Sequence, residues 1–152
     1  MADHSIEFLD HLPADIDARV LRGHVNDEVG HGIVCDYKPF SLVIRSAAGG
    51  AIGVLSAYTA FAEIYVGDIW VDPGHRGIGL GRTLLAALEK HYQDQGYNNI
   101  NLVTSRFQAV GFYEKCGYEI EFVRINKHHP KLTKTFFVKF FHDEPQTKGI
   151  LD

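Results

Sequence analysis

The feature that most constrains this 152-residue chain is a glycine-rich turn between an apolar run and an amphipathic helical pattern. Gly77, Gly79 and Gly81 take every second position, so the backbone can adopt positive φ and approach a ligand without obstruction by Cβ. Because a helix is expected to follow at once, its unpaired N–H groups and the positive end of its dipole face the turn. Arg76 and Arg82 add positive charge. The pattern predicts a strand, an anion-binding turn and a helix.

Two nucleotide-binding motifs do not fit this turn. A dinucleotide site requires G-x-G-x-x-G, and Arg82 stands where its third glycine would be. A P-loop ends in G-K-[ST], whereas this turn ends in Gly81-Arg82-Thr83. The glycine spacing alone is equally compatible with a tight strand–helix connection that binds nothing.

Composition and charge narrow the class of protein. With 45% hydrophobic and 22% charged residues, the chain is expected to be one globular domain, residues 1–152. A net charge of −4 argues against a nucleic-acid partner. Two widely separated cysteines indicate no disulfide framework and fit a reducing cytosol. The chain shows neither a signal-peptide pattern at its start nor an apolar run long enough to span a membrane, so we expect a cytoplasmic protein without a membrane partner.

Hydrophobic periodicity predicts alternating helices and strands. In the first half we expect a short strand over 5–9, a helix from Pro13 to about Gly30, and a hairpin of 40–44 with 52–59. In the second half we expect a strand over 63–71, a helix closed by Gly96, strands at 100–104, 118–124 and 135–141, and a short helix over 107–116. In the helix after the turn, one face carries the apolar residues Leu80, Leu84, Leu85, Leu88 and Tyr92. Hairpins followed by strand–helix–strand units predict an α/β fold with a mixed sheet covered by helices.

Two motifs in this order resemble the GNAT superfamily of acyl-CoA-dependent N-acyltransferases. The first is R-x-x-G-x-G at Arg76, Gly79 and Gly81, and the second is G-F-Y-E-K-C-G-Y over 111–118. The resemblance runs from about Gly53 to Val123. It implies a mixed, mostly antiparallel central sheet with helices on both faces. It further implies acetyl-CoA as acyl donor and an amine-bearing acceptor. Because family members are often homodimers, a homodimer is also expected.

The resemblance also implies a set of donor-binding residues. The strand before the turn would carry a bulge, and its main chain at Ile69, Trp70 and Val71 would bind the pantetheine arm and stabilise the oxyanion. The pyrophosphate would be bound by the turn and the first residues of the helix: Arg76, Gly77, Ile78, Gly79, Leu80, Gly81, Arg82 and Thr83. Many family members carry an asparagine where this chain has Arg106. That contact is then either lost or made by Ser105, Arg106 or Gln108.

For catalysis, the resemblance assigns Tyr113 as the general acid that protonates the leaving thiolate. Glu63, thirteen residues before Arg76, is the candidate general base. Asp68 lies on the same strand with opposite side-chain parity, so only one of the two carboxylates is expected to face the cleft. Each of them is also compatible with a solvent-facing role. Cys116 is rejected as a nucleophile, because family members transfer the acyl group directly.

The nine histidines show no metal-binding spacing, and we expect no metal. His128 and His129 precede Pro130 in a loop that either contacts the acceptor or is simply solvated. His75 either reaches a phosphate or is an exposed loop residue.

The sequence therefore predicts an N-acetyltransferase that works by direct attack in a ternary complex. The alternative is a non-catalytic acyl-CoA-binding regulatory or sensor module. A third reading, a subunit of a larger assembly, would use an exposed apolar patch around the pairs Phe136-Phe137 and Phe140-Phe141. The acceptor, the acyl-chain preference and the identity of the base stay open.

Overall fold

The computed structural model describes residues 4–142, and the chain divides between Cys35 and Asp36 into two compact units. The first unit contains helix α1 (Ala14–Gly30), which begins directly after Pro13 as predicted. Gly32 has a φ of 68° and lies in the turn that follows α1. The predicted strand over 5–9 is wrong, because these residues form no regular structure. An apolar pattern this short becomes a strand only if a neighbouring strand satisfies its backbone groups.

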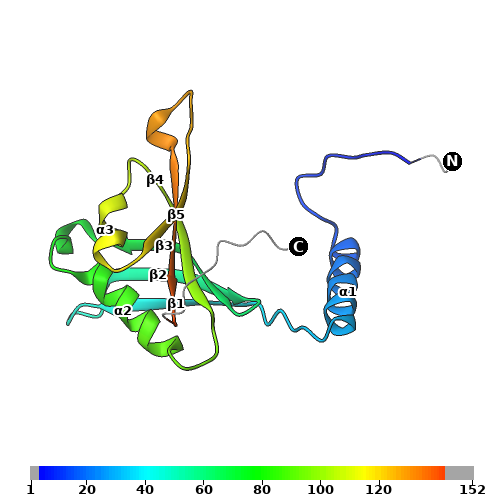
Figure 1. Ribbon diagram of the computed structural model, residues 1–152, viewed down its shortest axis with the longest axis horizontal. Helices are drawn as coiled ribbons and strands as arrows, with labels where there is room; N and C mark the ends of the chain where they lie inside the picture. Colours follow the sequence, from blue (N-terminus) through cyan, green and yellow to red (C-terminus); the bar gives the residue numbers. More distant parts are fainter. Residues whose placement is uncertain (1–3, 143–152) are drawn as a thin grey trace. The chain divides into compact units, whose positions relative to one another are not determined.

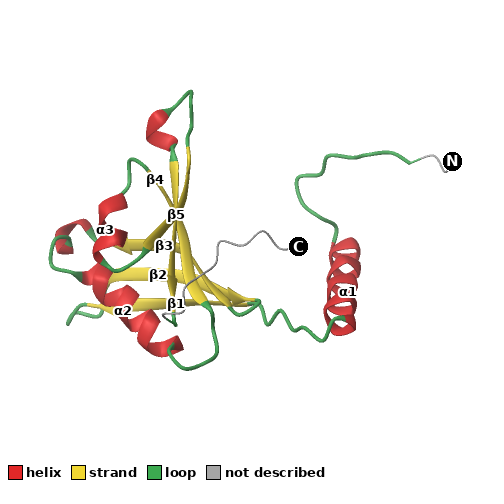
Figure 2. Ribbon diagram, in the orientation of Figure 1, coloured by secondary structure: helices red, strands yellow, loops and turns green. Residues whose placement is uncertain are grey.

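The second unit is built on a six-stranded sheet (Figures 1 and 2). Its order is β1-β2-β3-β4-β6-β5, and only β3 and β4 pair in parallel. The strands are β1 (Lys38–Arg45), β2 (Ala51–Ala60), β3 (Glu63–Val71), β4 (Asn99–Ser105), β5 (Glu119–Arg124) and β6 (Lys134–Phe140). The predicted fold class, a mixed and mostly antiparallel sheet with helices, is confirmed.

Helix α2 (Leu80–Tyr92) connects the two parallel strands and covers one face of the sheet. Leu84, Leu85 and Leu88 on its predicted apolar face are buried against Leu55, Ile64, Ile100 and Phe137. The expected end at Gly96 is wrong, since α2 stops at Tyr92 and Gln93 already has a ψ of 135°. Gly96 instead uses its positive φ of 84° in the turn that leads into β4.

The remaining elements are short. The 3₁₀ turn η1 (Pro73–His75) follows β3, and η2 (Pro130–Leu132) lies between β5 and β6. Helix α3 covers Val110–Lys115, so it is shorter than the helix predicted over 107–116. Gly117, with a φ of 87°, ends α3 and turns the chain into β5.

A bulge in β3 and the short β3–β4 ladder create an opening inside the sheet. Opposite β2, Val66 pairs with Ala57 and Asp68 pairs with Ser56, so Gly67 is an extra residue in β3. The parallel pairing with β4 begins at Glu63 and ends at Val66, opposite Leu102. Beyond that point the two strands separate. The bulge that the family resemblance implies is therefore present.

Candidate functional site

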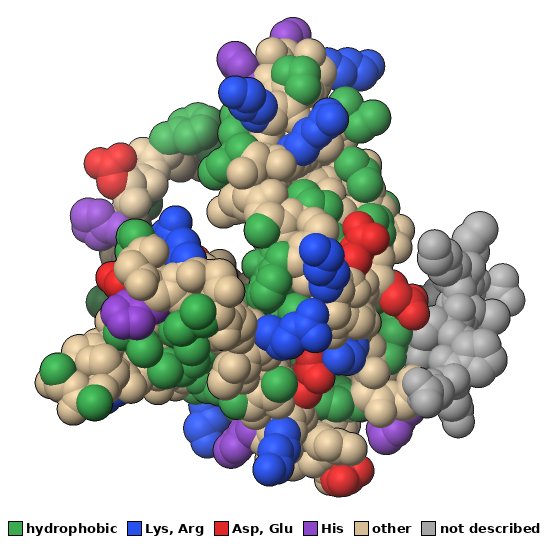
Figure 3. Space-filling view, turned by 90° about the vertical axis from the view of Figure 1, so that its left-hand side faces the viewer, with side chains coloured by type: hydrophobic (Ala, Val, Ile, Leu, Met, Phe, Trp, Pro, Cys, Tyr) green, Lys and Arg blue, Asp and Glu red, His purple; other side chains and the backbone are tan. Residues whose placement is uncertain are grey.

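A cleft of about 700 Å³ occupies the opening between β3 and β4. One wall is β3 from Val66 to Val71, and the glycine turn and the start of α2 close one end. The other wall is formed by the end of β4, by the loop that follows it and by helix α3. Figure 3 shows this side of the molecule hollowed, with Lys, Arg and His side chains near the rim and at the tip above. The volume is that of a pocket for a ligand of cofactor size.

The glycine turn has the conformation of an anion site. Gly77 and Gly79 have φ values of 81° and 89°, and a Cβ on either would meet no atom within 4 Å. Glycine is thus required by the backbone conformation, and the space above the turn is open to a ligand. Gly79 is the N-cap of α2, and the first N–H groups of the helix, from Leu80 to Arg82, have no intrahelical acceptor.

The positive side chains around the turn are partly engaged with the main chain. Arg76 Nε donates to the Val71 carbonyl at 3.0 Å, and Arg82 Nη2 donates to the Lys115 carbonyl at 3.2 Å. Each guanidinium has five N–H donors, so each retains donors for an anion. His75 Nδ1 lies 2.8 Å from a carboxylate oxygen of Asp72, and this hydrogen bond is the main reason that the pKa of Asp72 is lowered.

The main chain of β3 offers donors to the cleft at alternate residues. The Asp72 N–H donates to the Ile52 carbonyl on β2. Because backbone groups of an antiparallel strand alternate in direction, those of Trp70, two residues earlier, also point toward β2. The N–H groups of Ile69 and Val71 therefore face the opposite side, where the ladder with β4 has already ended. These two groups are the donors that could stabilise negative charge within the cleft.

Tyr113 lines the cleft from α3. Its ring packs against Phe137 with centroids 5.4 Å apart and against Phe112 at 5.1 Å. Burial raises the pKa of Tyr113 above its usual value, and the nearby negative charge of Asp68 raises it further. The phenol therefore keeps its proton through neutral and moderately alkaline pH. Among residues 4–142, the Tyr113 hydroxyl donates to no acceptor, so it is available to a ligand.

The two carboxylates of β3 occupy different surroundings. Glu63 does not line the cleft, and its carboxylate accepts hydrogen bonds from the Tyr65 hydroxyl and, at 2.8 Å, from the Asn99 amide. Asp68 does line the cleft.

The parity expected for these carboxylates is wrong, because the extra residue at Gly67 shifts the alternation by one. Glu63 pairs with Ala60, and Asp68 pairs with Ser56, so both side chains lie on the same face of the sheet.

Most of the sequence-predicted residues meet at the cleft. Its lining includes Ile69, Trp70, Val71, Arg76, Gly77, Gly79, Leu80, Gly81, Arg82 and Tyr113. Ile78 and Thr83, like Glu63, are not part of the lining. The side chain of Ile78 is 69% exposed, and both the N–H and the hydroxyl of Thr83 donate to the Gly79 carbonyl.

The β4 wall contains residues that sequence reasoning did not assign. Val103, Thr104 and Ala109 line the cleft, together with Gln108. Gln108 Oε1 accepts hydrogen bonds from Thr104 Oγ1 at 3.0 Å and from Ser105 N at 2.9 Å, which fixes the end of β4. Of the three residues considered as a substitute for the family asparagine, only Gln108 lies in the cleft. The signal was the departure at Arg106 itself, which drew attention to this segment.

Other candidate groups lie outside the cleft. The N–H groups of His128 and His129 both donate to the Asn126 side chain, which forms a tight turn in the exposed loop. Both cysteines are free, and burial raises the pKa of Cys116, which is unfavourable for a nucleophilic thiolate.

The described residues contain neither a group of metal ligands nor a membrane-spanning helix. Between residues 4 and 142, no three His, Cys, Asp or Glu side chains are grouped so that they could hold a metal ion. In the same residues, no helix has the length and apolarity needed to cross a membrane.

Comparison with known proteins gives a consistent set of similarities. The model of the acetyltransferase (GNAT) family matches residues 14–118. A blasticidin-S acetyltransferase of Streptomyces morookaense is 34% identical over 93 residues, which are 60% of this chain and 65% of that protein. A mycothiol acetyltransferase of Paenarthrobacter aurescens is 38% identical over 63 residues, 40% of this chain and 19% of that protein. The chain thus spans less than two thirds of the length of either relative.

Solved structures share the fold over most of the chain. A crystal structure from Agrobacterium tumefaciens superposes with a TM-score of 0.75 at 20% identity, covering 90% of this chain and 99% of that one. An acetyltransferase of Bacillus cereus superposes with a TM-score of 0.68 at 25% identity, covering 88% and 97%.

Proposed function

Because the chain belongs to the acetyltransferase (GNAT) family, we propose that it transfers an acetyl group from acetyl-CoA to a primary amine. One observation carries the proposal: the cleft that opens where β3 leaves β4 runs from an anion-binding turn to a protonated phenol. Acetyl-CoA has the matching chemistry, with a pyrophosphate at one end and a thioester at the other. We further propose a cytoplasmic protein, in which no metal takes part in the reaction.

Each part of the cleft fits a part of the donor. The N–H groups at the start of α2, with Arg76 and Arg82, would hold the pyrophosphate. Gly77 and Gly79 leave the room that such a close approach needs. The N–H groups of Ile69 and Val71 would bind the arm and the thioester oxygen.

In the proposed reaction the amine nitrogen attacks the acetyl carbonyl carbon. A C–N bond forms and the C–S bond breaks, so the sulfur leaves as a thiolate. Tyr113 gives its hydroxyl proton to this thiolate, and the ammonium product of the attack loses a proton to a base or to water. The N–H groups on β3 stabilise the negative charge that the carbonyl oxygen acquires in between.

The base is proposed to be a carboxylate of β3. Glu63 is the candidate that the sequence suggests, and its carboxylate is held at the start of the strand by hydrogen bonds from Tyr65 and Asn99. Asp68 is the candidate that lines the cleft, and its charge already acts on Tyr113. Asp68→Asn and Glu63→Gln distinguish them, because loss of the base removes the acidic limb of the kcat/KM profile. We expect Asp68→Asn to lower kcat/KM at least tenfold and Glu63→Gln to have the smaller effect. The reverse order would identify Glu63 as the base.

The first experiment is a calorimetric titration with acetyl-CoA, with CoA and NAD as comparators. We expect saturable binding of acetyl-CoA in the micromolar range, about −8 kcal/mol, and none of NAD. Absence of acetyl-CoA binding would reject the proposed function.

The second experiment asks whether the bound donor reacts. Release of CoA thiol is followed with blasticidin S, suggested by the Streptomyces relative, with a peptide bearing a free N-terminus, and with a lysine peptide. Turnover with any of them identifies the enzyme. Donor binding without turnover on a broad amine panel would favour the acyl-CoA-binding sensor instead, for which the confined position of Glu63 is the supporting observation.

A further inference from the structure

Helix α3, which carries Tyr113, is too short to fix its own position. It has six residues, and an isolated helix of that length does not form in water. Its place must therefore be set by the groups it contacts. Two of these contacts come from the first turn of α2, the same segment that offers N–H groups to an anion.

The first contact is between Gly81 and the ring of Phe112. A Cβ at Gly81 would lie 3.0 Å from Phe112 Cζ and 3.5 Å from Cε2. Gly81 lies inside α2 and does not have positive φ, in contrast to Gly77 and Gly79. The constraint at 81 is therefore the Phe112 ring, which would have to shift by a few tenths of an ångström to admit a Cβ, and not the backbone conformation.

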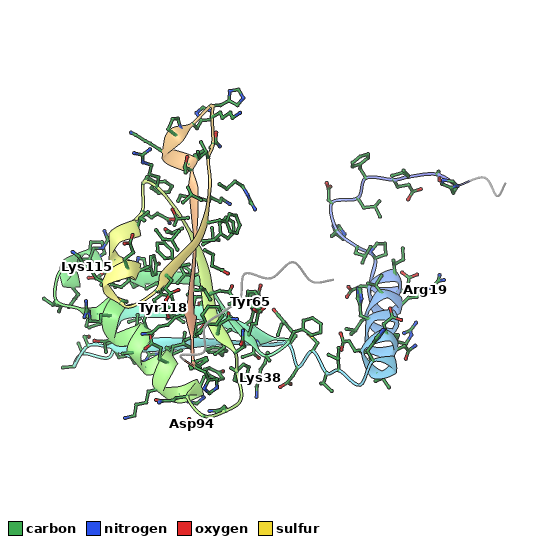
Figure 4. The ribbon with its side chains drawn as sticks, viewed as in Figure 1. Arg19, Lys38, Tyr65, Asp94, Lys115 and Tyr118 are labelled. Atoms are coloured by element: carbon green, nitrogen blue, oxygen red, sulfur yellow. The ribbon has the colours of Figure 1, made fainter. Side chains whose placement is uncertain are left out.

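The second contact joins Arg82 to the carboxyl end of α3. Arg82 Nη2 donates to the Lys115 carbonyl at 3.2 Å, and Figure 4 labels Lys115 at this end of the helix. From the other side, Lys139 Nζ donates to the Cys116 carbonyl at 3.1 Å and to the Glu89 carboxylate at 2.9 Å. Two cations thus satisfy carbonyls that the helix leaves unpaired, where its dipole is negative.

We propose that Gly81 and Arg82 are positioning residues, which seat α3 on α2 and thereby hold the Tyr113 hydroxyl in the cleft. This inference rests on the proposed function, because it concerns the acid of that reaction. The position of Gly81 and one hydrogen bond of the Arg82 side chain would then fix Tyr113. The N–H groups of the two residues, with the remaining N–H donors of Arg82, would bind the phosphates of acetyl-CoA. One turn of α2 would set both the binding of the donor and the geometry of its cleavage.

The Gly81–Phe112 contact is tested by a double-mutant cycle. Gly81→Ala should displace α3 by a few tenths of an ångström and lower kcat roughly tenfold, with KM for acetyl-CoA unchanged within about twofold. Phe112→Leu shortens the opposing side chain, so the double variant should recover part of the kcat lost in Gly81→Ala. Gly111→Ala is the matched control, because its Cβ would meet no atom within 4 Å. Additive losses, or a loss confined to KM, would overturn the role of Gly81.

Arg82 is tested by Arg82→Met against Lys90→Met, which removes the same charge from an exposed site on the same helix. Arg82→Met should lower kcat several-fold and move the alkaline limb of the kcat profile to lower pH, because burial is what raises the pKa of Tyr113. Lys90→Met should change neither. A rise in KM for acetyl-CoA with kcat and the pH profile intact would make Arg82 a phosphate ligand only.

A third measurement separates this inference from the proposed function. The N–H groups of Cys116 and Tyr118 donate to α3 carbonyls, including that of Tyr113. Their hydrogen exchange in the free protein should quicken in Arg82→Met and not in Lys90→Met, whether or not acetyl-CoA is a substrate. If exchange is unchanged in Arg82→Met while the enzyme is active, the positioning role of Arg82 is rejected and the proposed reaction stands. If exchange is altered but the protein does not bind acetyl-CoA, the proposed reaction is rejected and the positioning role stands.

Discussion

Tyr113 has three properties that fit the proposed role of proton donor. Its ring packs against Phe112 and Phe137, the residue lines the cleft, and burial and Asp68 raise its pKa, which keeps the phenol protonated. Seven tyrosines occur in the chain, so residue type alone could not select this one. The selection came from its place in the second motif, and the structure adds the surroundings that favour the protonated form.

Replacing Tyr113 by phenylalanine should remove the proposed acid without altering the packing of the ring. We expect Tyr113→Phe to lower kcat about 10²-fold, with the acetyl-CoA dissociation constant unchanged within twofold. In the parent protein, kcat should fall only as pH rises through the raised pKa of Tyr113, which lies above the usual value for a tyrosine, since the ionised phenol has no proton to give. Steady-state kinetics over pH and calorimetry provide the test. A collapse of affinity would instead identify Tyr113 as a binding or packing residue.

The limits of sequence reasoning at this scale are visible in Asp68 and Glu63. Alternation along a strand assigns opposite faces to residues five apart, and both carboxylates nevertheless share one face. The reason is a single extra residue, Gly67; a lone glycine inside a strand is compatible with a bulge, but the parity expected for the two carboxylates did not take it into account. In the turn, by contrast, the glycines at 77 and 79 predict a backbone with positive φ, and both residues have positive φ in the structure.

Among the elements, the connection from β3 to α2 is the one on which the proposed binding of acetyl-CoA depends. Gly79 is both the N-cap of α2 and a residue with a φ of 89°, a region that β-branched side chains rarely adopt. The N–H groups that follow it are aimed by this conformation.

Gly79→Val should therefore distort the turn, cost about 1–3 kcal/mol of stability and abolish binding of acetyl-CoA while the protein stays folded. Gly50→Val is the matched control, since this glycine lies in the β1–β2 turn, lacks positive φ, and has its nearest neighbour atom 3.8 Å from the added Cβ. Calorimetric titration and thermal unfolding report the two effects separately. If Gly79→Val bound acetyl-CoA normally, the turn would be a connector and not a site.

Element prediction succeeded where residue type or periodicity dominated. Strand β3 was predicted correctly from its β-branched and aromatic residues, although the bulge at Gly67 interrupts its alternation. The apolar face of α2 was predicted correctly because its helical spacing is regular. Residues 5–9 have an apolar alternation without a pairing partner. The insertion of β6 between β4 and β5 depends on tertiary packing and has no local signature.

For the whole chain, the sequence predicts one domain over 1–152. The buried core cluster lies between Leu55 and Phe137, wholly in the second unit. The first unit ends at Cys35, and chains below about 40 residues rarely fold alone. We therefore expect a single calorimetric transition, with calorimetric and van't Hoff enthalpies in agreement. Two resolved transitions would contradict the single-domain prediction.

The predicted homodimer also belongs to this scale. Alternation places Phe137 in the core with 0% exposure and turns Phe136 to the other face, where its ring stacks on Phe122 at 4.2 Å. Phe122 on β5, at the end of the sheet, is 49% exposed, so apolar surface is available for association. Sedimentation at several concentrations should give about twice the 17.0 kDa of the chain. A constant mass of one chain would reject the dimer.

The early end of the β3–β4 ladder has a thermodynamic consequence of its own. Because the pairing of β3 with β4 ends at Val66, the main-chain N–H groups of β3 beyond this point have no partner strand on that side. An extended, hydrogen-bonding arm lying between the two strands would act as the missing strand and complete the sheet. In the proposed complex, the donor would therefore supply hydrogen-bond partners that the sheet of the free protein lacks. Its unfolding free energy would rise by about 2.7 kcal/mol when acetyl-CoA is present at a hundred times its dissociation constant.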